Sequence, residues 1–339
     1  MIRPGGENEP DPDPAPGSGE PEGRPGTRTF TIEGRAAPAL FVVGWLATIA
    51  GLVLLFVGLQ AAGALSTVLF LAGLVLLSVG LVTAAGSQGL ERRARGDEAY
   101  AGPSPILVFL AWIPTAILGL VLVGIPLELL GVALEGPAVS VLTLVVQAAV
   151  YVGLIRLLVV DTGALSWAQM GVRRPSTSVP RELLAGAAWA LPIILLTGPL
   201  ASVLVSLFGV TPDSPLPPTG DPAGIGLNLL AGAVIAPLGE ELFFRAFATT
   251  AWVMSLGATR GIVRAGLAFA FVHVLAVQAT GVGEGAALAL IGFATRVPIG
   301  LALGWLFVRR GSIWAPLGLH AAFNAILLVL AEMRPDVAA

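Results

Sequence analysis

Residues 37–61 read APALFVVGWLATIAGLVLLFVGLQA, a run without a single charged side chain. A helix needs about 20 apolar residues to cross the roughly 30 Å hydrocarbon core of a bilayer, so this stretch predicts a transmembrane helix. Similar runs follow along the chain, and nine spans are expected, with eight as the alternative because one run contains Arg296 and Pro298. The expected spans lie near 37–61, 64–86, 104–130, 138–160, 182–209, 225–253, 261–281, 285–308 and 312–331.

The composition also indicates a membrane protein. Of 339 residues, 56% are hydrophobic and only 12% are charged, and the mean hydropathy is +0.89. Soluble domains carry about 25% charged residues. We therefore expect an all-α, polytopic helical bundle. Two stretches, GLVLLFVGL at 51–59 and GLVLLSVGL at 73–81, place glycines on one helix face, where they permit close helix packing.

The charged and reactive residue types exclude several functions. A net charge of −3 offers no broad basic surface for nucleic acid. The absence of cysteine excludes thiol catalysis, thiolate metal sites and disulfides. All 18 basic residues are arginine, so no lysine can act as a base or form a Schiff base. This use of arginine in place of lysine is typical of a GC-rich bacterial gene.

The segment before the first span is rich in proline, glycine and acidic residues and has no apolar core, so it does not resemble a signal peptide. We expect a disordered cytoplasmic tail over 1–35. Arginines then cluster at alternate junctions between spans, whereas the intervening loops near 62–65, 131–137, 210–224 and 282–285 contain none. By the positive-inside rule, the N-terminus is cytoplasmic and, with nine spans, the C-terminus is extracytoplasmic.

Several polar side chains lie deep inside the expected spans, where an ionisable residue costs about 2.5–3.5 kcal/mol and usually has a function. With a helical rise of about 1.5 Å per residue, Glu241, His273 and Asn324 lie about 18 Å from the cytoplasmic ends of their spans, and His320 lies about 12 Å in. They are therefore expected to meet in one water-containing pocket. These residues are Glu240, Glu241 and Arg245 in the sixth span, His273 in the seventh, and His320 and Asn324 in the ninth.

The local spacing assigns different partners to the two carboxylates. Glu241 and Arg245 are four residues apart and can form an ion pair. Glu240 points about 100° away from Glu241 around the helix, toward another neighbour. Pro237 and Gly239 weaken the helix before this pair and free backbone carbonyls, which are tolerated at depth only beside protein or water.

Such groups can activate water. A partly buried carboxylate can act as a general base, and imidazole and amide groups can orient water and stabilise an oxyanion. A divalent metal such as zinc, held by His273 and His320 with Glu240 or Glu241, is an open alternative. The HExxH arrangement is absent, since neither histidine is followed by glutamate.

Three motifs carry a family resemblance. Glu240–Arg245 matches EExxxR, Phe269–His273 matches FxxxH, and His320–Asn324 matches HxxxN. In this order on successive hydrophobic helices, they resemble the CAAX-protease and bacteriocin-processing (CPBP, or ABI) family of intramembrane peptidases, over about 225–330. The resemblance implies a cut in a membrane-associated protein or peptide.

The resemblance also implies roles for the matching residues. Glu240 would be the general base, while His273, His320 and Asn324 would position the water and stabilise the oxyanion. Glu241, held by Arg245, would contribute to or shape the site, and Phe269 would pack against it.

The expected organisation is a tail over 1–35, a two-helix hairpin and basic loop over 36–103, further transmembrane helices over 104–224, and a peptidase core over 225–332. Two other functions stay open: an inactive membrane scaffold or bacteriocin-immunity protein, and a proton-coupled transporter that uses glutamate and histidine as a relay. Arg296 is left without a role.

Overall fold

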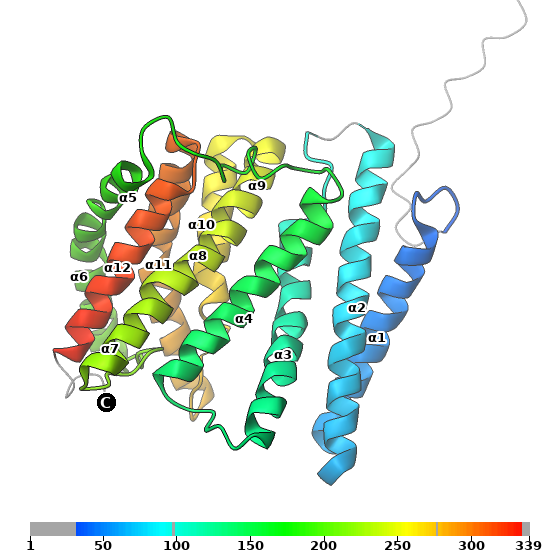
Figure 1. Ribbon diagram of the computed structural model, residues 1–339, viewed down its shortest axis with the longest axis horizontal. Coiled ribbons are helices and arrows are strands. Elements are labelled where there is room, and N and C mark those ends of the chain that lie inside the picture. Colours follow the sequence, from blue (N-terminus) through cyan, green and yellow to red (C-terminus); the bar gives the residue numbers. More distant parts are fainter. Residues whose placement is uncertain (1–31, 97–98, 276, 334–339) are drawn as a thin grey trace, which may run out of the picture. The chain divides into compact units, whose positions relative to one another are not determined.

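The computed structural model describes residues 32–96, 99–275 and 277–333. Contacts divide the chain into Met1–Arg35 and Ala36–Ala339, and the predicted disordered tail lies almost wholly outside the described residues. In the described part of the second unit, every regular element is a helix, which confirms the expected all-α class (Figure 1). The elements are α1 Pro38–Gln60, α2 Gly63–Arg95, α3 Pro105–Leu129, α4 Pro137–Ile155, η1 Arg156–Val160, α5 Val179–Ala187, α6 Ala190–Phe208, α7 Pro222–Leu229, η2 Leu230–Ile235, α8 Ala236–Glu240, η3 Glu241–Thr249, α9 Thr250–Leu256, α10 Ala258–Val272, α11 Val282–Arg310 and α12 Trp314–Glu332, with η marking π-helix.

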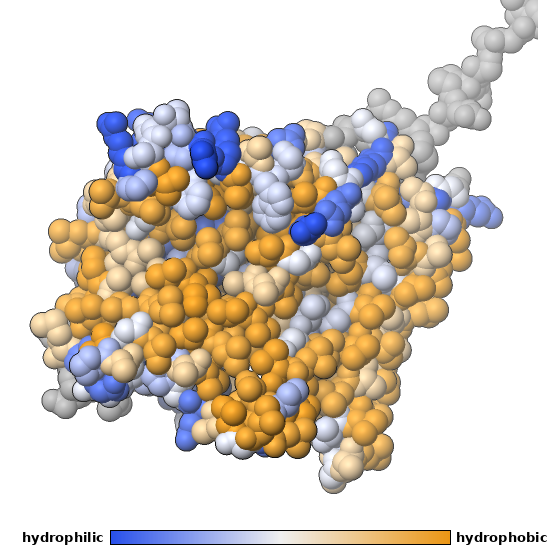
Figure 2. Space-filling view, viewed as in Figure 1, coloured by the Kyte–Doolittle hydropathy of each residue, from blue (hydrophilic) through white to orange (hydrophobic). Residues whose placement is uncertain are grey.

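Among the described residues, eight helical stretches are long and apolar enough to cross a membrane. The chain is thus a multi-pass membrane protein. Large apolar side chains are exposed along these helices, among them Leu46, Leu52, Leu191 and Leu195, as expected for surfaces that face lipid. Figure 2 shows this apolar surface over the helices of the second unit, with hydrophilic residues gathered mainly toward its ends.

The span expected over 261–281 is wrong in its extent. Helix α10 ends at Val272, and at about 1.5 Å per residue its 15 residues cover only about 22 Å. Between His273 and the extended N-cap Gly281, the described residues 274–275 and 277–280 belong to no helix. There the carboxylate of Glu284 accepts a hydrogen bond from the Thr280 backbone N–H at 2.8 Å, which orders the start of α11. His273 therefore caps a short helix rather than sitting in the middle of a long one.

Small residues bring α1 and α2 into close contact, as the paired glycine stretches indicate. A Cβ added at Gly51 would lie 2.5 Å from the backbone nitrogen of Leu77, and one at Gly73 would lie 2.9 Å from the nitrogen of Leu55. No side chain fits between the two backbones at these points. Helix α2 in turn packs on α3, which packs on α4.

The span from Pro222 to Leu256 is the most buried of the eight. It contains two π-helical segments, η2 and η3, on either side of the short α8. Pro237 lacks a backbone N–H and opens the helical hydrogen-bond ladder, and Thr249 donates its hydroxyl to the carbonyl of Phe244, five residues earlier, at 2.7 Å. One π segment thus ends shortly before Glu240, and the other begins at Glu241.

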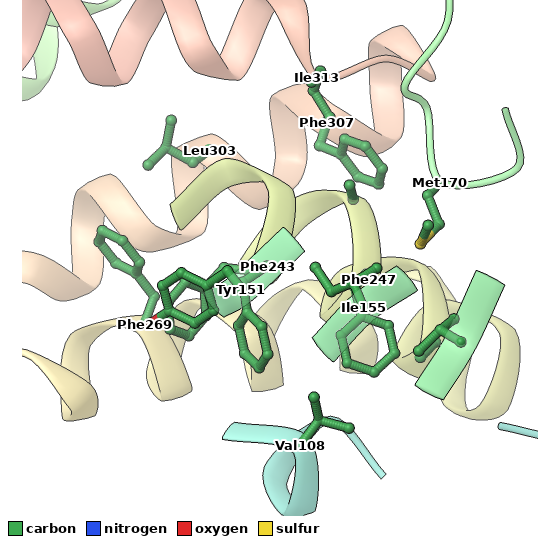
Figure 3. Close-up of a cluster of buried hydrophobic side chains, with 14 of the residues drawn as sticks. Val108, Tyr151, Ile155, Met170, Phe243, Phe247, Phe269, Leu303, Phe307 and Ile313 are labelled. Carbon is green, nitrogen blue, oxygen red and sulfur yellow. The ribbon is translucent and has the colours of Figure 1, made fainter. Parts of the chain in front are cut away.

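An aromatic core surrounds this span. Phe243 and Phe247 from η3 pack with Tyr151 of α4 and with Phe307 of α11 in one cluster of buried side chains (Figure 3). Tyr151 also stacks on Trp112 of α3, with ring centroids 4.4 Å apart. This cluster holds the glutamate-bearing span in place against helices α3, α4 and α11.

Helices α5 and α12 touch through glycines, and this contact makes a testable prediction. A Cβ on Gly318 of α12 would overlap the backbone of Leu183 on α5. We expect Gly318→Ala to separate the two helices and to lower the midpoint of unfolding in detergent micelles. Gly198→Ala in α6 is the matched control, because nothing lies within 4 Å of its added Cβ. Equal stability of the two variants would contradict the close contact.

Candidate active site

Glu241 lies at the centre of a fully buried charge cluster. Its side chain is 0% exposed, and Oε1 lies 3.1 Å from Nη1 of Arg245 and 2.8 Å from Nδ1 of His320. The ion pair indicated by the i,i+4 spacing is therefore present. A buried carboxylate needs such partners, because an uncompensated charge in an apolar core is strongly destabilising.

Glu240 points to a different place, as its position on the helix indicates. Its side chain is 22% exposed and lines a cavity, and Oε2 lies 3.6 Å from Nε2 of His273 and 3.7 Å from Nε2 of His320. These distances are too long for hydrogen bonds, and Oε2 is a buried acceptor without a hydrogen-bond partner among the described residues. The only two histidines of the chain thus face one carboxyl group.

The other nitrogen of each imidazole determines its tautomer. Nδ1 of His273 lies 2.7 Å from the carbonyl oxygen of Phe269, and Nδ1 of His320 lies next to the Glu241 carboxylate. Both partners are acceptors, so both Nδ1 atoms carry the hydrogen and donate it. In the neutral rings, the two Nε2 atoms are therefore free to accept a proton on the side of Glu240.

Asn324 joins α12 to the π-helical segment η2. Its Nδ2 donates to the carbonyl oxygen of Gly232 at 2.8 Å. The amide has a second N–H, and Asn324 also lines the cavity that contains Glu240.

Phe269 contacts three charged or polar groups of the cluster. The Arg245 guanidinium lies over its ring, 4.2 Å from the centroid, and the ring meets His320 edge-on with centroids 5.6 Å apart. The backbone carbonyl of Phe269 accepts the hydrogen bond from Nδ1 of His273. Phe269 therefore both packs against the site and orients one of its imidazoles.

Two cavities meet at Glu240. The larger has a volume of about 800 Å³ and extends between α4, α6, α11 and α12. The smaller has a volume of about 340 Å³ and extends toward Phe109 and Trp112 of α3. Glu240, His273 and Arg296 line both.

The residues give no support for a metal centre. Among the described residues, no group of three or more histidine, cysteine, aspartate or glutamate side chains is placed to hold a metal ion. The nitrogen and oxygen atoms that face each other are His273 Nε2, His320 Nε2 and Glu240 Oε2.

The sequence left Arg296 without a role and did not indicate two backbone carbonyls of the site. Arg296 lines both cavities and donates from Nη1 to the carbonyl of Gly292 at 3.1 Å. The carbonyls of Phe269 and Gly232 hold His273 and Asn324. The i,i+4 spacing of Phe269 and His273 could have indicated the contact between His273 and the Phe269 carbonyl. No sequence pattern indicated the hydrogen bond from Asn324 to the carbonyl of Gly232.

Comparison with known proteins finds one family match. Residues 222–326 match the family model described as type II CAAX prenyl endopeptidase Rce1-like, and the match includes all three motifs. No curated protein matches the chain, and no solved structure does. The match confirms the resemblance to CAAX-type proteases over this part of the chain. It supports a CAAX-type intramembrane endopeptidase, a hydrolase whose substrate is a peptide or protein in the bilayer.

Proposed function

We propose that this protein hydrolyses a peptide bond of a membrane-associated protein or peptide with a water molecule activated by Glu240. The observation that carries the proposal is the position of the Glu240 carboxyl group. It borders the cavity, and its Oε2 lies within 3.7 Å of the acceptor nitrogens of both histidines. Carboxylates that act as bases in proteases need such access to water and such neighbours for the transferred proton.

In the first step, a water molecule in the cavity donates a hydrogen bond to Glu240. The carboxylate accepts the proton as the water oxygen forms a bond to the carbonyl carbon of the substrate. The proton then has three acceptors close together, since Nε2 of His273 and of His320 both lie near Oε2. It can therefore move onto an imidazole without leaving the site.

The attack places negative charge on the carbonyl oxygen, and donors are needed there. An imidazole that has received the proton presents an Nε2–H donor, and Asn324 has its second amide N–H. When the C–N bond breaks, the same proton passes to the leaving amine, and the carboxylate of Glu240 is restored. Water supplies both the hydroxyl group of the new acid and the proton of the new amine.

Glu241 and Arg245 are proposed as the frame that orients His320. The carboxylate of Glu241 accepts from Nδ1 of His320, so it stabilises that ring both as a neutral tautomer and when protonated. Arg245 compensates the buried charge of Glu241 at 3.1 Å. Neither side chain needs to touch the substrate for this role.

The two cavities favour an endopeptidase. A polypeptide cut within its length needs space on both sides of the scissile bond, and cavities of about 800 and 340 Å³ extend from Glu240 in different directions. A site that removes single terminal residues would need space mainly on one side.

The test is a comparison of membrane peptides and proteins from cells that carry wild type, Glu240→Ala or His273→Ala. We expect at least one processed fragment to disappear in both variants. Exposed Glu128, which lines neither cavity, supplies the control Glu128→Ala, in which processing should persist. If both active-site variants keep every fragment and the full biological activity of wild type, the scaffold or immunity alternative replaces the peptidase.

A further inference from the structure

The larger cavity occupies one half of the bundle along its axis. On three helices, its lining begins at the level of the reactive groups and continues toward the same end, over Gly232–Glu240, Ile291–Ile299 and His320–Leu328. Each stretch rises about 12 Å. The cavity reaches the surface at two loops, where Glu135 and Pro212 are exposed.

The opposite half of the bundle is filled. Met170, Phe247 and Ile313 are buried in one cluster with Phe307 (Figure 3), and each of the first three is at most 1% exposed. The larger cavity is lined by none of these residues. The described side chains therefore leave the larger cavity open toward the loops of Glu135 and Pro212 and pack tightly toward the other end.

Contacts identify which loops share each end. At the filled end, Trp314 donates from Nε1 to the carbonyl of Arg173 at 2.8 Å, and Arg310 lies 3.6 Å from Glu182. At the open end, the carboxylate of Glu332 accepts from the backbone N–H of Thr219 at 2.9 Å. The C-terminal end of α12 thus lies beside the loop that borders the cavity.

The arginines are distributed unequally between these ends. Among the described residues, the arginines outside the spans lie mainly in the loops and helix termini of the filled end, whereas the described loops of the open end carry none. The positive-inside rule places the arginine-rich end in the cytoplasm. The arginines of the filled end are Arg92, Arg93, Arg95, Arg156, Arg173, Arg174, Arg181, Arg260, Arg264, Arg309 and Arg310.

We infer that the active site is reached from the extracytoplasmic side, so that its substrate is an exported or membrane-anchored polypeptide whose cleaved segment lies in the outer half of the bilayer. That the cavity receives a peptide substrate rests on the proposed function. That the substrate enters from the extracytoplasmic side rests on the distribution of the arginines. Water for hydrolysis enters by the same route, because the cavity is the open connection between Glu240 and the surface loops.

The cavity wall indicates the chemistry of that segment. It is mainly apolar, with Ile291, Phe323 and Leu327 among its residues, and Arg296 is the only arginine in it. An extended chain covers about 3.3 Å per residue, so 12 Å accommodates about four residues. The segment that follows or precedes the cut is therefore short, extended and apolar, and it can place an acidic group or a carbonyl beside Arg296.

The natural absence of cysteine makes the direction of access directly measurable. Single cysteines are introduced at Ser140 and Thr143, which line the cavity from α4, and each variant is treated with a membrane-impermeant methanethiosulfonate reagent. The reagent is applied to right-side-out cells and to inverted vesicles. Ser176→Cys, exposed on the loop between η1 and α5, reports the cytoplasmic side. Val145→Cys is the matched control on the lipid-facing side of the same helix.

We expect both cavity cysteines to react at least tenfold faster in right-side-out cells than in inverted vesicles. Ser176→Cys should show the opposite preference, and Val145→Cys should react in neither, because thiolates form poorly in lipid. Reaction of the cavity cysteines only in inverted vesicles, or equal rates for the cavity cysteines and Val145→Cys, overturns the inference. Labelling requires no proteolysis, so a failed peptidase proposal is distinguishable from a failed access route.

Discussion

Replacing Glu240 by glutamine is expected to lower the rate of peptide hydrolysis by about 10²–10⁴-fold while the helical bundle stays folded. Glutamine keeps the size of the side chain and an acceptor oxygen, but it cannot take the proton from water. The position tolerates the change because the side chain is 22% exposed to a cavity and is not part of the buried Glu241–Arg245 pair. The loss should appear in kcat, with little change in KM, because the substrate still fills both cavities.

The measurement is single-turnover hydrolysis by purified protein in proteoliposomes, using the fragment precursor found in the membrane comparison. Glu128→Gln removes an exposed carboxylate of the same type and should retain the wild-type rate. Melting midpoints of all three proteins in detergent exclude misfolding as the cause. A loss smaller than about tenfold in Glu240→Gln would assign the base to another group.

Replacing Arg245 by methionine should produce the largest loss of stability of any single change in the site. Arg245 is 1% exposed and compensates the fully buried carboxylate of Glu241 at 3.1 Å. Methionine fills part of the volume but leaves that charge, among the described side chains, with His320 as its one remaining partner. Removal of one member of a buried ion pair costs about 3–5 kcal/mol. The lost contact between the guanidinium and the Phe269 ring adds to this cost.

The experiment compares denaturation midpoints in mixed micelles for Arg245→Met, Glu241→Gln and the double variant. Because the double variant carries neither charge, we expect it to be more stable than Arg245→Met alone. Destabilisation that simply adds in the double variant would show that the two residues do not act as a pair. A free energy of unfolding for Arg245→Met within about 1 kcal/mol of wild type would show that the buried charge is compensated elsewhere.

The stability and the activity of this site are thus expected to depend on different glutamates. Glu241 is inside the packed cluster and holds His320, while the neighbouring Glu240 borders the cavity. Adjacent residues on a helix point about 100° apart, which separates a structural carboxylate from a reactive one without any change of helix. This separation explains how two adjacent glutamates can lie in the most buried span of the protein.

The sequence alone determined that the chain crosses the membrane repeatedly, that Glu241 pairs with Arg245, and that Glu240 points elsewhere. Hydrophobic length and i,i+4 spacing are local properties, because each helix in lipid must satisfy its own backbone and presents its side chains at fixed angles. The prediction that the polar residues share one depth also rests on local counting, since helical rise is constant.

Only the tertiary structure decided what those residues face. The early end of α10 at His273, the π segments beside Glu240, and the bond from Asn324 to the carbonyl of Gly232 depend on contacts between helices distant in sequence. A π segment shifts the angular register of every residue that follows it, so the rotation of the sixth span could not be calculated from an ideal helix. The cavity likewise exists because the helices around it pack fully at one end of the bundle and incompletely at the other, which no single span encodes.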